Sequence, residues 1–296
     1  NFQIIGMGGS ILGAKAIYDF LKYKIKKNFL FVDNLQASQK LDKKKSFVNL
    51  IISKSGNTTE TIVNANILIK KKDRNIFITE NRDSYLHLLA EKLKAEIIHH
   101  NNYIGGRYSV LSEVGMLPAE LMGLNSSSFK HLNNLIKNKK FINALVSNVS
   151  SILYFSKKKK FNSIIINYDE KSENLFKWYQ QLVAESLGKK NKGILPVLSY
   201  MPKDNHSVMQ YFLDGIKNSF YTLFFVKEKN SKKINDNKIS FSIDNLNLDK
   251  INVFAFSDLS SLSTKTYKKN NLNIVEVFTE ENFDEDEIIS LAISNG

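Results

Sequence analysis

Short, almost continuously apolar segments alternate with longer segments of helical periodicity through most of this 296-residue chain. The apolar segments of the first half are QIIGM (3–7), FLFVD (29–33), VNLIIS (48–53), NIFIT (75–79) and AEIIHH (95–100). Between them, residues 11–25, 58–72 and 84–93 place apolar side chains every three or four positions, as one face of a helix does. Strands without polar alternation are buried on both faces, so the pattern predicts an α/β fold with a parallel sheet between layers of helices.

A second cycle of the same kind follows, without residue-level identity to the first. It comprises a helical stretch at 132–155, a strand SIIIN at 163–167, a helix at 174–187, apolar segments at 194–199, 220–226, 251–256 and 273–277, and a helix at 284–294. We therefore expect two α/β domains, residues 1–130 and 131–296.

Composition excludes several classes of site. The chain has no cysteine, which rules out disulfides, thiolate zinc sites and a cysteine nucleophile. It has no apolar stretch of the roughly 18–20 residues that a membrane span needs. We expect no membrane association and a cytoplasmic location.

The formal charge of +13 invites the alternative of a nucleic-acid-binding protein. The lysine runs, at 43–45, 70–72 and 157–160, are spread along the chain and are not interleaved with aromatic residues. This distribution favours solvated surface over a nucleic-acid interface.

The first predicted strand ends in GMGGSILG (6–13), a glycine turn that opens a helix. Ile11 departs from the dinucleotide-binding pattern GxGxxG. Gly8 and Gly9 allow close approach of a ligand to the backbone, and Ser10 places a hydroxyl at the helix start, where parallel sheets bind ligands. A purely structural turn would also use glycine, so this motif alone leaves both interpretations open.

SKSGNTTET (53–61) follows the third predicted strand, at the same edge of the sheet. Its hydroxyl and amide groups, together with N–H groups of the next helix, predict an anion cradle formed by Ser53, Ser55, Asn57, Thr58 and Thr59. The alternative is a capping box, with Asn57 as N-cap and Glu60 three residues later. Capping does not explain Ser53, Ser55 and Thr58, so we favour an anion site. Without a GxxxxGK[ST] sequence, a phosphate ester is expected rather than a nucleoside triphosphate.

Two further segments carry charged groups suited to catalysis. In GGRYS (105–109) the glycines allow a turn that aims Arg107 into the crevice, although a surface arginine is the alternative. In the helix at 177–189, Glu185 follows Trp178 and Leu182 on one face. We expect partial desolvation of this carboxylate, which suits a general base. The alternative is a boundary glutamate paired with Lys189.

His206, in YMPKDNHSVMQYFLDG (200–215), lies in a polar loop just before a helix, within reach of Asp204 or Asn205. His99 and His100 are adjacent in a predicted strand, so they point to opposite faces and cannot hold one metal together. No spacing of His, Asp and Glu predicts a metal site.

Together, five segments resemble the glucose-6-phosphate isomerase family: GMGGS, SKSGNTTET, GGRYS, QQLVAESLGK and PKDNHSVMQYFLDG. They occur in that family's order, and the resemblance runs from residue 3 to about 217 with weaker similarity beyond. SGNTTET and ESLGK followed by GILPV are similar to the shorter bacterial branch of the family.

The resemblance implies two sugar-isomerase (SIS) domains, each a flavodoxin-like parallel sheet covered by helices. It also implies a homodimer with shared active sites. The reaction interconverts D-glucose 6-phosphate and D-fructose 6-phosphate in glycolysis and gluconeogenesis, without metal or organic cofactor. The resemblance assigns the phosphate to Ser53, Ser55 and Thr58, whereas the lysine of that motif, Lys54, can point elsewhere.

By the same resemblance, Gly9 and Ser10 line the sugar site and Gln181 positions the substrate. Arg107 steadies the charge of the intermediate, and Glu185 moves a proton between C2 and C1 through a cis-enediolate. His206 assists ring opening and reaches the site from the neighbouring subunit.

The chain departs from the family near its end, where family members carry a lysine in a helix after an FDQ-type motif. This sequence has neither feature before SLAISNG, and it starts directly in a strand-like segment, so we expect a fragment lacking both ends. Two alternatives share the sugar-phosphate chemistry: an isomerase that also accepts mannose 6-phosphate or another sugar phosphate, and a non-catalytic phosphosugar-binding protein.

Overall fold

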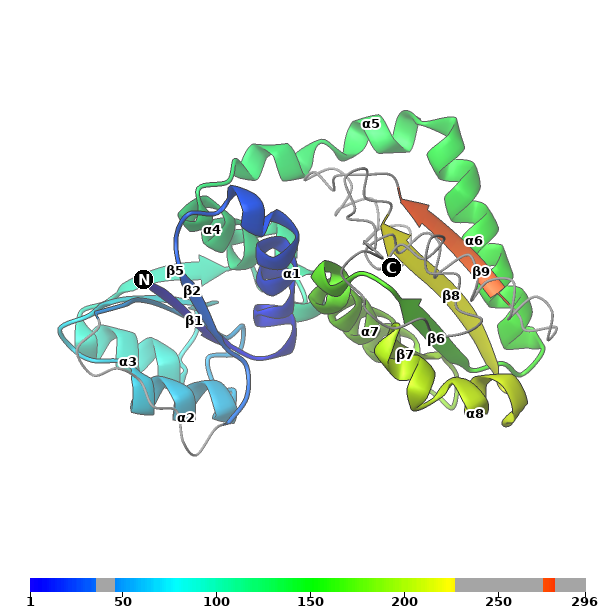
Figure 1. Ribbon diagram of the computed structural model, residues 1–296. Coiled ribbons are helices and arrows are strands. Elements are labelled where there is room, and N and C mark those ends of the chain that lie inside the picture. Colours follow the sequence, from blue (N-terminus) through cyan, green and yellow to red (C-terminus); the bar gives the residue numbers. More distant parts are fainter. Residues whose placement is uncertain (36–45, 227–273, 280–296) are drawn as a thin grey trace, which may run out of the picture.

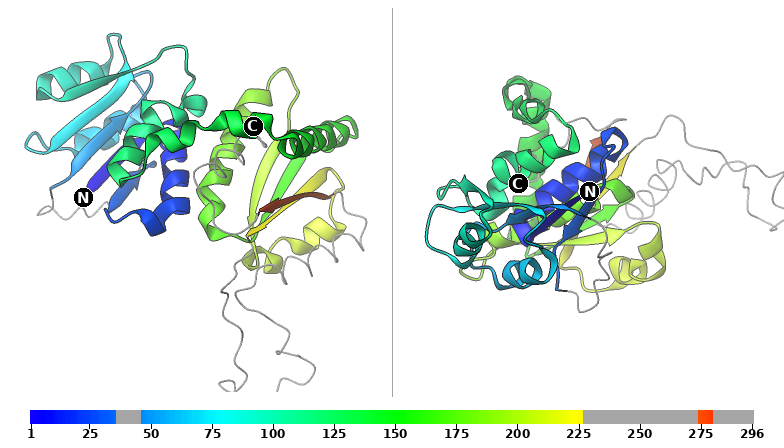
Figure 2. Two further views of the ribbon diagram at one scale, coloured as in Figure 1. Left: turned by 90° about the horizontal axis from the view of Figure 1, so that it is seen from above. Right: turned by 90° about the vertical axis from the view of Figure 1, so that its left-hand side faces the viewer.

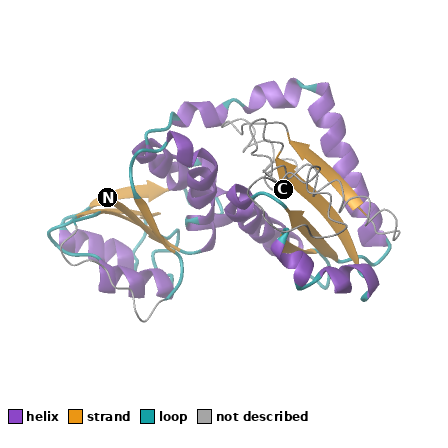
Figure 3. Ribbon diagram, viewed as in Figure 1, coloured by secondary structure: helices purple, strands orange, loops and turns teal. Residues whose placement is uncertain are grey.

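The computed structural model of the chain describes residues 1–35, 46–226 and 274–279 (Figure 1). Within these residues the two predicted α/β cycles are present, each built on a parallel sheet with helices on both faces (Figure 3). The predicted fold class is therefore confirmed.

The first sheet has the strand order β2-β1-β3-β4-β5, the order of flavodoxin-like folds. Its strands are β1 (Phe2–Gly6), β2 (Phe29–Val32), β3 (Val48–Ile52), β4 (Arg74–Glu80) and β5 (Glu96–His100), all parallel. Its helices are α1 (Leu12–Leu21), α2 (Thr59–Leu68), α3 (Tyr85–Leu93) and α4 (Glu113–Met122). Short 3-10 turns connect them: η1 (Gly8–Ser10), η2 (Lys22–Lys24), η3 (Gly106–Leu111) and η4 (Ser126–Lys130).

The side chains of successive residues in β1 pack on opposite faces of the sheet, because side chains alternate along a strand. Ile5 belongs to a buried cluster with Ala65 of α2 and Leu86 of α3, whereas Ile4 belongs to another with Val114 of α4. Both isoleucines are fully buried, and each such side chain contributes roughly 1.5–3 kcal/mol to folding. This two-sided burial is why the strands are apolar throughout.

The second sheet has the order β7-β6-β8-β9, the same winding as the first four strands of the first sheet. Its strands are β6 (Asn162–Asn167), β7 (Leu195–Tyr200), β8 (Ser219–Val226) and β9 (Ile274–Thr279), again parallel. Its helices and turns are α5 (Leu132–Lys137), α6 (Lys139–Lys157), η5 (Glu170–Ser172), α7 (Glu173–Leu187), η6 (Lys203–His206) and α8 (Met209–Asp214). One face is covered by α6 and α7 and the other by α8.

The two halves are joined through α1 and α7, which pack against each other between the sheets (Figures 1 and 2). Ile17 and Phe20 of α1 share a buried cluster with Phe176 of α7, and Asn174 donates a hydrogen bond to Asp19. The predicted domain boundary at residue 130 coincides with the end of η4. It stays a prediction, because this core cluster runs through both halves.

Most described strands lie within one or two residues of their predicted limits, but the helices differ more from expectation. The predicted helices 11–25 and 58–72 end early, at Leu21 of α1 and Leu68 of α2. The predicted helix 132–155 is two helices, because the Asn138 side chain accepts hydrogen bonds from the N–H groups of Lys140 and Phe141 and starts α6. Helix α4 was not predicted, since Gly115 and Pro118 interrupt its helical pattern. The predicted segments 251–256 and 284–294 lie outside the described residues.

No helix in the described part of the chain combines the length and the apolar character needed to cross a membrane.

Candidate active site

Three loops meet where the strands of the first sheet end. The chain leaves β1 and β3, which are neighbours, in opposite directions, and ligands bind in the crevice at such a point in open α/β sheets. The turn η1 follows β1, and residues 53–58 follow β3. The third loop follows β5 and leads into η3, which carries Arg107.

Gly9 brings the first and third loops into direct contact. A Cβ atom at Gly9 would lie 2.3 Å from the carbonyl oxygen of Gly106 and 2.6 Å from the backbone nitrogen of Arg107. No real side chain fits at such distances. Glycine at this position therefore sets how closely Arg107 approaches η1 and the neighbouring Ser10.

The loop after β3 presents the predicted hydroxyl groups. Ser53 is buried, and its hydroxyl lies 2.8 Å from that of Thr58. Ser55 accepts a hydrogen bond from the N–H of Asn57, and Gly56 takes a left-handed conformation with φ +66°. The three predicted phosphate residues thus lie in one tight turn ahead of α2.

The predicted capping box is wrong. The N-cap of α2 is Thr58, and no side chain caps this helix. The side-chain oxygen Oδ1 of Asn57 instead accepts a hydrogen bond from the N–H of Tyr85, at the start of α3. Because the first N–H groups of a helix have no partner within it, those of α2 face the loop uncapped. This arrangement suits an anion better than the capping alternative does.

Lys54 points away from this turn. Its ammonium group donates to the carbonyl oxygen of Asn102 at 2.9 Å and lies 3.4 Å from the carboxylate of Glu80. Glu80 also pairs with Arg82 at 3.0 Å.

The structure brings together Arg107 and Glu185, which lie 78 positions apart in the sequence. The guanidinium Nη1 donates to the Glu185 carboxylate at 2.7 Å, and Nε donates to the Ser186 hydroxyl at 2.9 Å. The alternative pairing of Glu185 with Lys189 is absent among the described residues. Two of the three guanidinium nitrogens of Arg107, Nε and Nη1, are therefore hydrogen-bonded to the last turn of α7.

Gln181 completes this group on α7. Its amide nitrogen donates to the second carboxylate oxygen of Glu185 at 3.2 Å. A Cβ atom at Gly8, where φ is +51°, would lie 2.8 Å from that same nitrogen. The amide oxygen of Gln181 is buried without a hydrogen-bond partner. Gln181 therefore lies between η1 and the carboxylate, with one buried acceptor that no described group satisfies.

The expected desolvation of Glu185 is not observed. Its side chain is 51% exposed, because position 185 lies beside the apolar stripe of α7 and not within it, while Leu182 and Val183 are buried. The exposed carboxylate is hydrogen-bonded to Arg107 and Gln181.

Three neighbours of Arg107 were not predicted as site residues. Trp178 donates from its indole N–H to the Arg107 carbonyl oxygen at 2.9 Å, and Tyr108 shares a hydrogen bond with Ser186 at 2.7 Å. The Arg107 guanidinium also lies over the Tyr108 ring, 4.6 Å from its centroid. In the sequence, Trp178 is recognisable only as part of the apolar face of the helix. Nothing in the sequence marks Ser186 as a site residue except its position next to Glu185.

These contacts shift two protonation equilibria. The Ser186 hydroxyl, followed by the Arg107 guanidinium, lowers the pKa of Tyr108 from its ordinary value. The hydrogen bond with Tyr108, together with the charge of Glu185, raises the pKa of Arg107. Arg107 is thus a permanent cation.

His206 is not joined to this group in the chain. It lies exposed in η6, and no hydrogen bond or ion pair within the described ranges links it to Arg107 or Glu185. Of its expected partners, Asp204 accepts instead from the N–H of Tyr200 at 2.7 Å. A role for His206 in a neighbouring subunit's site stays a prediction.

A separate cavity of about 470 Å³ lies at the carboxyl ends of β6 and β7, away from the Arg107–Glu185 pair. Asp169 and Tyr200 line it together with Asp19 of α1. Burial raises the pKa of Asp169, although the positive charge of Lys171 opposes this in part. No group of three or more potential metal ligands occurs in the part of the chain that the structure describes, and the expectation of a metal-free site stays a prediction.

The sequence model of the phosphoglucose isomerase family matches residues 1–195, which contain the three loops and all of α7. The chain belongs to the phosphoglucose isomerase family.

Relatives within the phosphoglucose isomerase family cover more of the chain. It is 36% identical over 265 residues to the glucose-6-phosphate isomerase of Methanocaldococcus jannaschii, covering 81% of this chain and 65% of the relative. It is 31% identical over 296 residues to that of Mycoplasmopsis pulmonis, covering 90% of this chain and 66% of the relative. The chain therefore spans about two thirds of the length of these relatives.

The fold is similar to that of a hypothetical protein from Thermus thermophilus. The TM-score is 0.78 at 21% sequence identity, over 99% of this chain and 75% of the other. This likeness supports the two-sheet α/β fold of the chain.

Proposed function

We propose that the protein to which this chain belongs interconverts D-glucose 6-phosphate and D-fructose 6-phosphate through a cis-enediolate. The observation that carries the proposal is the 2.7 Å contact between the Arg107 guanidinium and the Glu185 carboxylate. A proton next to a carbonyl group is removed by such a carboxylate, and the resulting enediolate is stabilised by a fixed cation.

The phosphate is assigned to the turn after β3. Donors come from the Ser55 hydroxyl, from the one proton that the Ser53–Thr58 hydrogen bond leaves free, and from the uncapped N–H groups at the start of α2, where the helix dipole favours an anion. Lys54 is left out of this assignment because its ammonium group is held by Asn102 and Glu80.

The sugar is assigned to the space beside η1, lined by Gly9 and Ser10 and bounded by Gln181. In this arrangement Glu185 takes the proton from C2 of the open-chain aldose and returns it to C1. The ketose forms when the proton of the C2 hydroxyl also passes to the oxygen on C1 of the enediolate. Arg107 leaves its ion pair in part to face the oxygen that gains negative charge. The unpartnered amide oxygen of Gln181 accepts a hydrogen bond from a sugar hydroxyl.

We further propose a cytoplasmic homodimer in which His206 of one subunit assists ring opening in the site of the other. The exposure of His206 and its position outside the Arg107–Glu185 group support a role at a subunit boundary. The proposed reaction needs neither a metal nor an organic cofactor, because carboxylate, guanidinium and imidazole supply the proton transfers and the charge stabilisation.

A coupled assay of the full-length protein tests the function. Fructose 6-phosphate and mannose 6-phosphate are supplied in parallel, and formation of glucose 6-phosphate is followed. We expect turnover of fructose 6-phosphate and none of mannose 6-phosphate. Turnover of both sugars would identify the broader isomerase, and binding without turnover of either would identify a phosphosugar-binding protein.

A further inference from the structure

The loop between β5 and Arg107 has little packing of its own. Asn101 and Asn102 are exposed, and the Tyr103 side chain is 92% exposed. Within the loop, the N–H of Ile104 donates to the carbonyl of Asn101 at 3.1 Å, and Tyr103 bonds to the Asn101 side chain. Such an exposed segment cannot by itself fix the place from which the Arg107 side chain starts.

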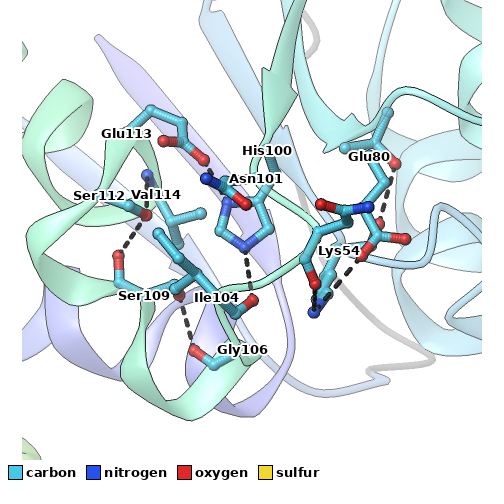
Figure 4. Close-up of polar contacts among 12 residues, drawn as sticks. Lys54, Glu80, His100, Asn101, Ile104, Gly106, Ser109, Ser112, Glu113 and Val114 are labelled. Carbon is cyan, nitrogen blue, oxygen red and sulfur yellow. Dashed lines mark hydrogen bonds and ion pairs between the residues drawn. The ribbon is translucent and has the colours of Figure 1, made fainter.

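A buried histidine holds one end of this loop. The His100 side chain is 1% exposed and lies between the Glu113 carboxyl group and the Ile104 carbonyl oxygen (Figure 4). Nδ1 bonds to Glu113, and Nε2 lies 3.1 Å from the Ile104 oxygen. Glu113 is the first residue of α4, so this pair ties the loop to that helix.

The partners of His100 assign one of its ring protons. A carbonyl oxygen only accepts, so Nε2 of His100 donates to Ile104. Nδ1 faces a carboxyl oxygen, so one further proton lies between His100 and Glu113, on either the ring or the carboxyl group. Both ring nitrogens are therefore engaged, and the ring cannot turn without breaking two buried hydrogen bonds.

Lys54 holds the loop from its other side. Its ammonium group donates to the Asn102 carbonyl oxygen and is compensated by Glu80, which is 8% exposed (Figure 4). Lys54 belongs to the turn after β3, so a single side chain connects the proposed phosphate turn to the loop ahead of Arg107.

We propose that His100 and Lys54 are positioning residues for Arg107. His100 holds the carbonyl group of Ile104, and Lys54 holds that of Asn102, two residues earlier. Together these two contacts fix the backbone of the loop relative to β5. Beyond the loop, the Ser109 hydroxyl donates to the Gly106 carbonyl at 2.6 Å and holds the start of η3 in place. Neither His100 nor Lys54 contacts the substrate.

The kinetic test rests on the proposed function and uses the full-length protein. Glu113→Ala frees His100 Nδ1, and Lys54→Met removes the second anchor while keeping the bulk of the side chain. Each is expected to lower kcat by roughly 10- to 100-fold, the effect of small misplacements of catalytic groups, with KM for fructose 6-phosphate unchanged. Glu96→Ala, a surface acid on the same strand β5, is the control and is expected to match the wild type.

Two results separate positioning from other roles. Glu113→Gln keeps a hydrogen bond to Nδ1 and is expected to restore most of kcat; a loss as large as that of Glu113→Ala would overturn the hydrogen-bonding role. Calorimetric affinity for inorganic phosphate is expected to be unchanged in Lys54→Met. Weaker phosphate binding with unchanged kcat would place Lys54 in the phosphate site and overturn its positioning role.

A readout independent of catalysis comes from Trp178, the one tryptophan of the 296-residue sequence, whose indole N–H bonds to the Arg107 carbonyl. The fluorescence of Trp178 is obtained by subtracting the emission spectrum of the same protein carrying Trp178→Phe. Glu113→Ala and Lys54→Met are expected to shift this emission to the red, whereas Glu96→Ala is not. If the wild type fails to isomerise sugar phosphates, the proposed function fails, and this shift still decides the positioning role. An unchanged emission with unchanged circular dichroism would overturn it.

Discussion

The ion pair between Arg107 and Glu185 adds little to the stability of the fold. The Glu185 side chain is half exposed and that of Arg107 is 18% exposed, and ion pairs that water reaches contribute about 0–1 kcal/mol because solvation competes and two long side chains lose freedom. Yet the arginine is held at four points, by Glu185, Ser186, Tyr108 and Trp178. Such a well-anchored cation beside an accessible carboxylate is explained better by chemistry on a ligand than by folding.

Replacing the carboxylate tests this interpretation. Glu185→Gln keeps the size of the side chain but removes the base, so kcat of the full-length protein is expected to fall by roughly 10²- to 10⁴-fold. Affinity for fructose 6-phosphate, measured by calorimetry, is expected to stay within about twofold because the phosphate contacts are intact. Near-normal turnover would contradict the assignment of Glu185 as base.

Removing hydroxyls from the turn after β3 tests the phosphate assignment. The double variant Ser55→Ala, Thr58→Ala loses two donors to an anion, each worth about 1.5–3 kcal/mol. The Kd for fructose 6-phosphate is therefore expected to rise by at least about 100-fold. Ser127→Ala, an exposed serine on η4, is the control. Unchanged affinity of the double variant would leave this turn without a phosphate role.

At the scale of elements, the close approach of η1 to η3 links two loops that leave different strands.

Strand positions could be predicted because their continuous apolar runs reflect burial on both faces. The helix α4 could not be predicted, because Gly115 is required by the packing of this helix against η3. A Cβ at Gly115 would lie 2.0 Å from the Val110 carbonyl oxygen. A local pattern of helix-forming residues does not register such a tertiary requirement.

The approach of η1 to η3 predicts that Gly9→Ala is harmful. The added Cβ meets backbone atoms of Gly106 that cannot move aside alone, so the free energy of unfolding is expected to fall by about 1–3 kcal/mol in urea titrations. Arg107 would also shift, which lowers kcat. Gly106→Ala is the stability control, because no heavy atom lies within 4 Å of its Cβ position. Equal stability of the two variants would contradict the close contact.

At the scale of the whole molecule, α1 and α7 turn two similar sheets into one body. Glu185 is carried by α7 of the second half, whereas Arg107 and the turn after β3 belong to the first. The site therefore depends on the buried cluster between α1 and α7, to which Ile17 and Phe176 belong. Either half alone would lack the Arg107–Glu185 contact.

The buried carboxyl of Asp169 makes overall stability depend on pH. Burial raises its folded pKa above the ordinary value of 3.8. Below that value the carboxyl is protonated in both folded and unfolded chains, so its ionisation costs nothing. As pH rises through the raised folded pKa, the buried group ionises, and the full cost is present at neutral pH.

Asp169→Asn is therefore expected to raise the free energy of unfolding at pH 7, with a gain that disappears as the pH falls towards 3.8. Urea titrations across this range measure the difference between the variant and the wild type. Glu170→Gln, an exposed neighbour on the same turn, is the control. A gain that is independent of pH would show that the charge of Asp169 is not its cause.

The α/β class, the alternation of strands and helices, and the chemical types of the groups at the strand ends could all be predicted from the amino-acid sequence. These follow from burial and backbone geometry, which act over a few residues. Three contacts could be found only in the folded chain: Glu185 pairs with Arg107 and not with Lys189, Asn57 bonds to α3 and caps no helix, and Lys54 bonds to the loop after β5. Each of these contacts joins residues at least 28 positions apart. Their partners depend on how whole elements pack, and local patterns carry no information about that packing.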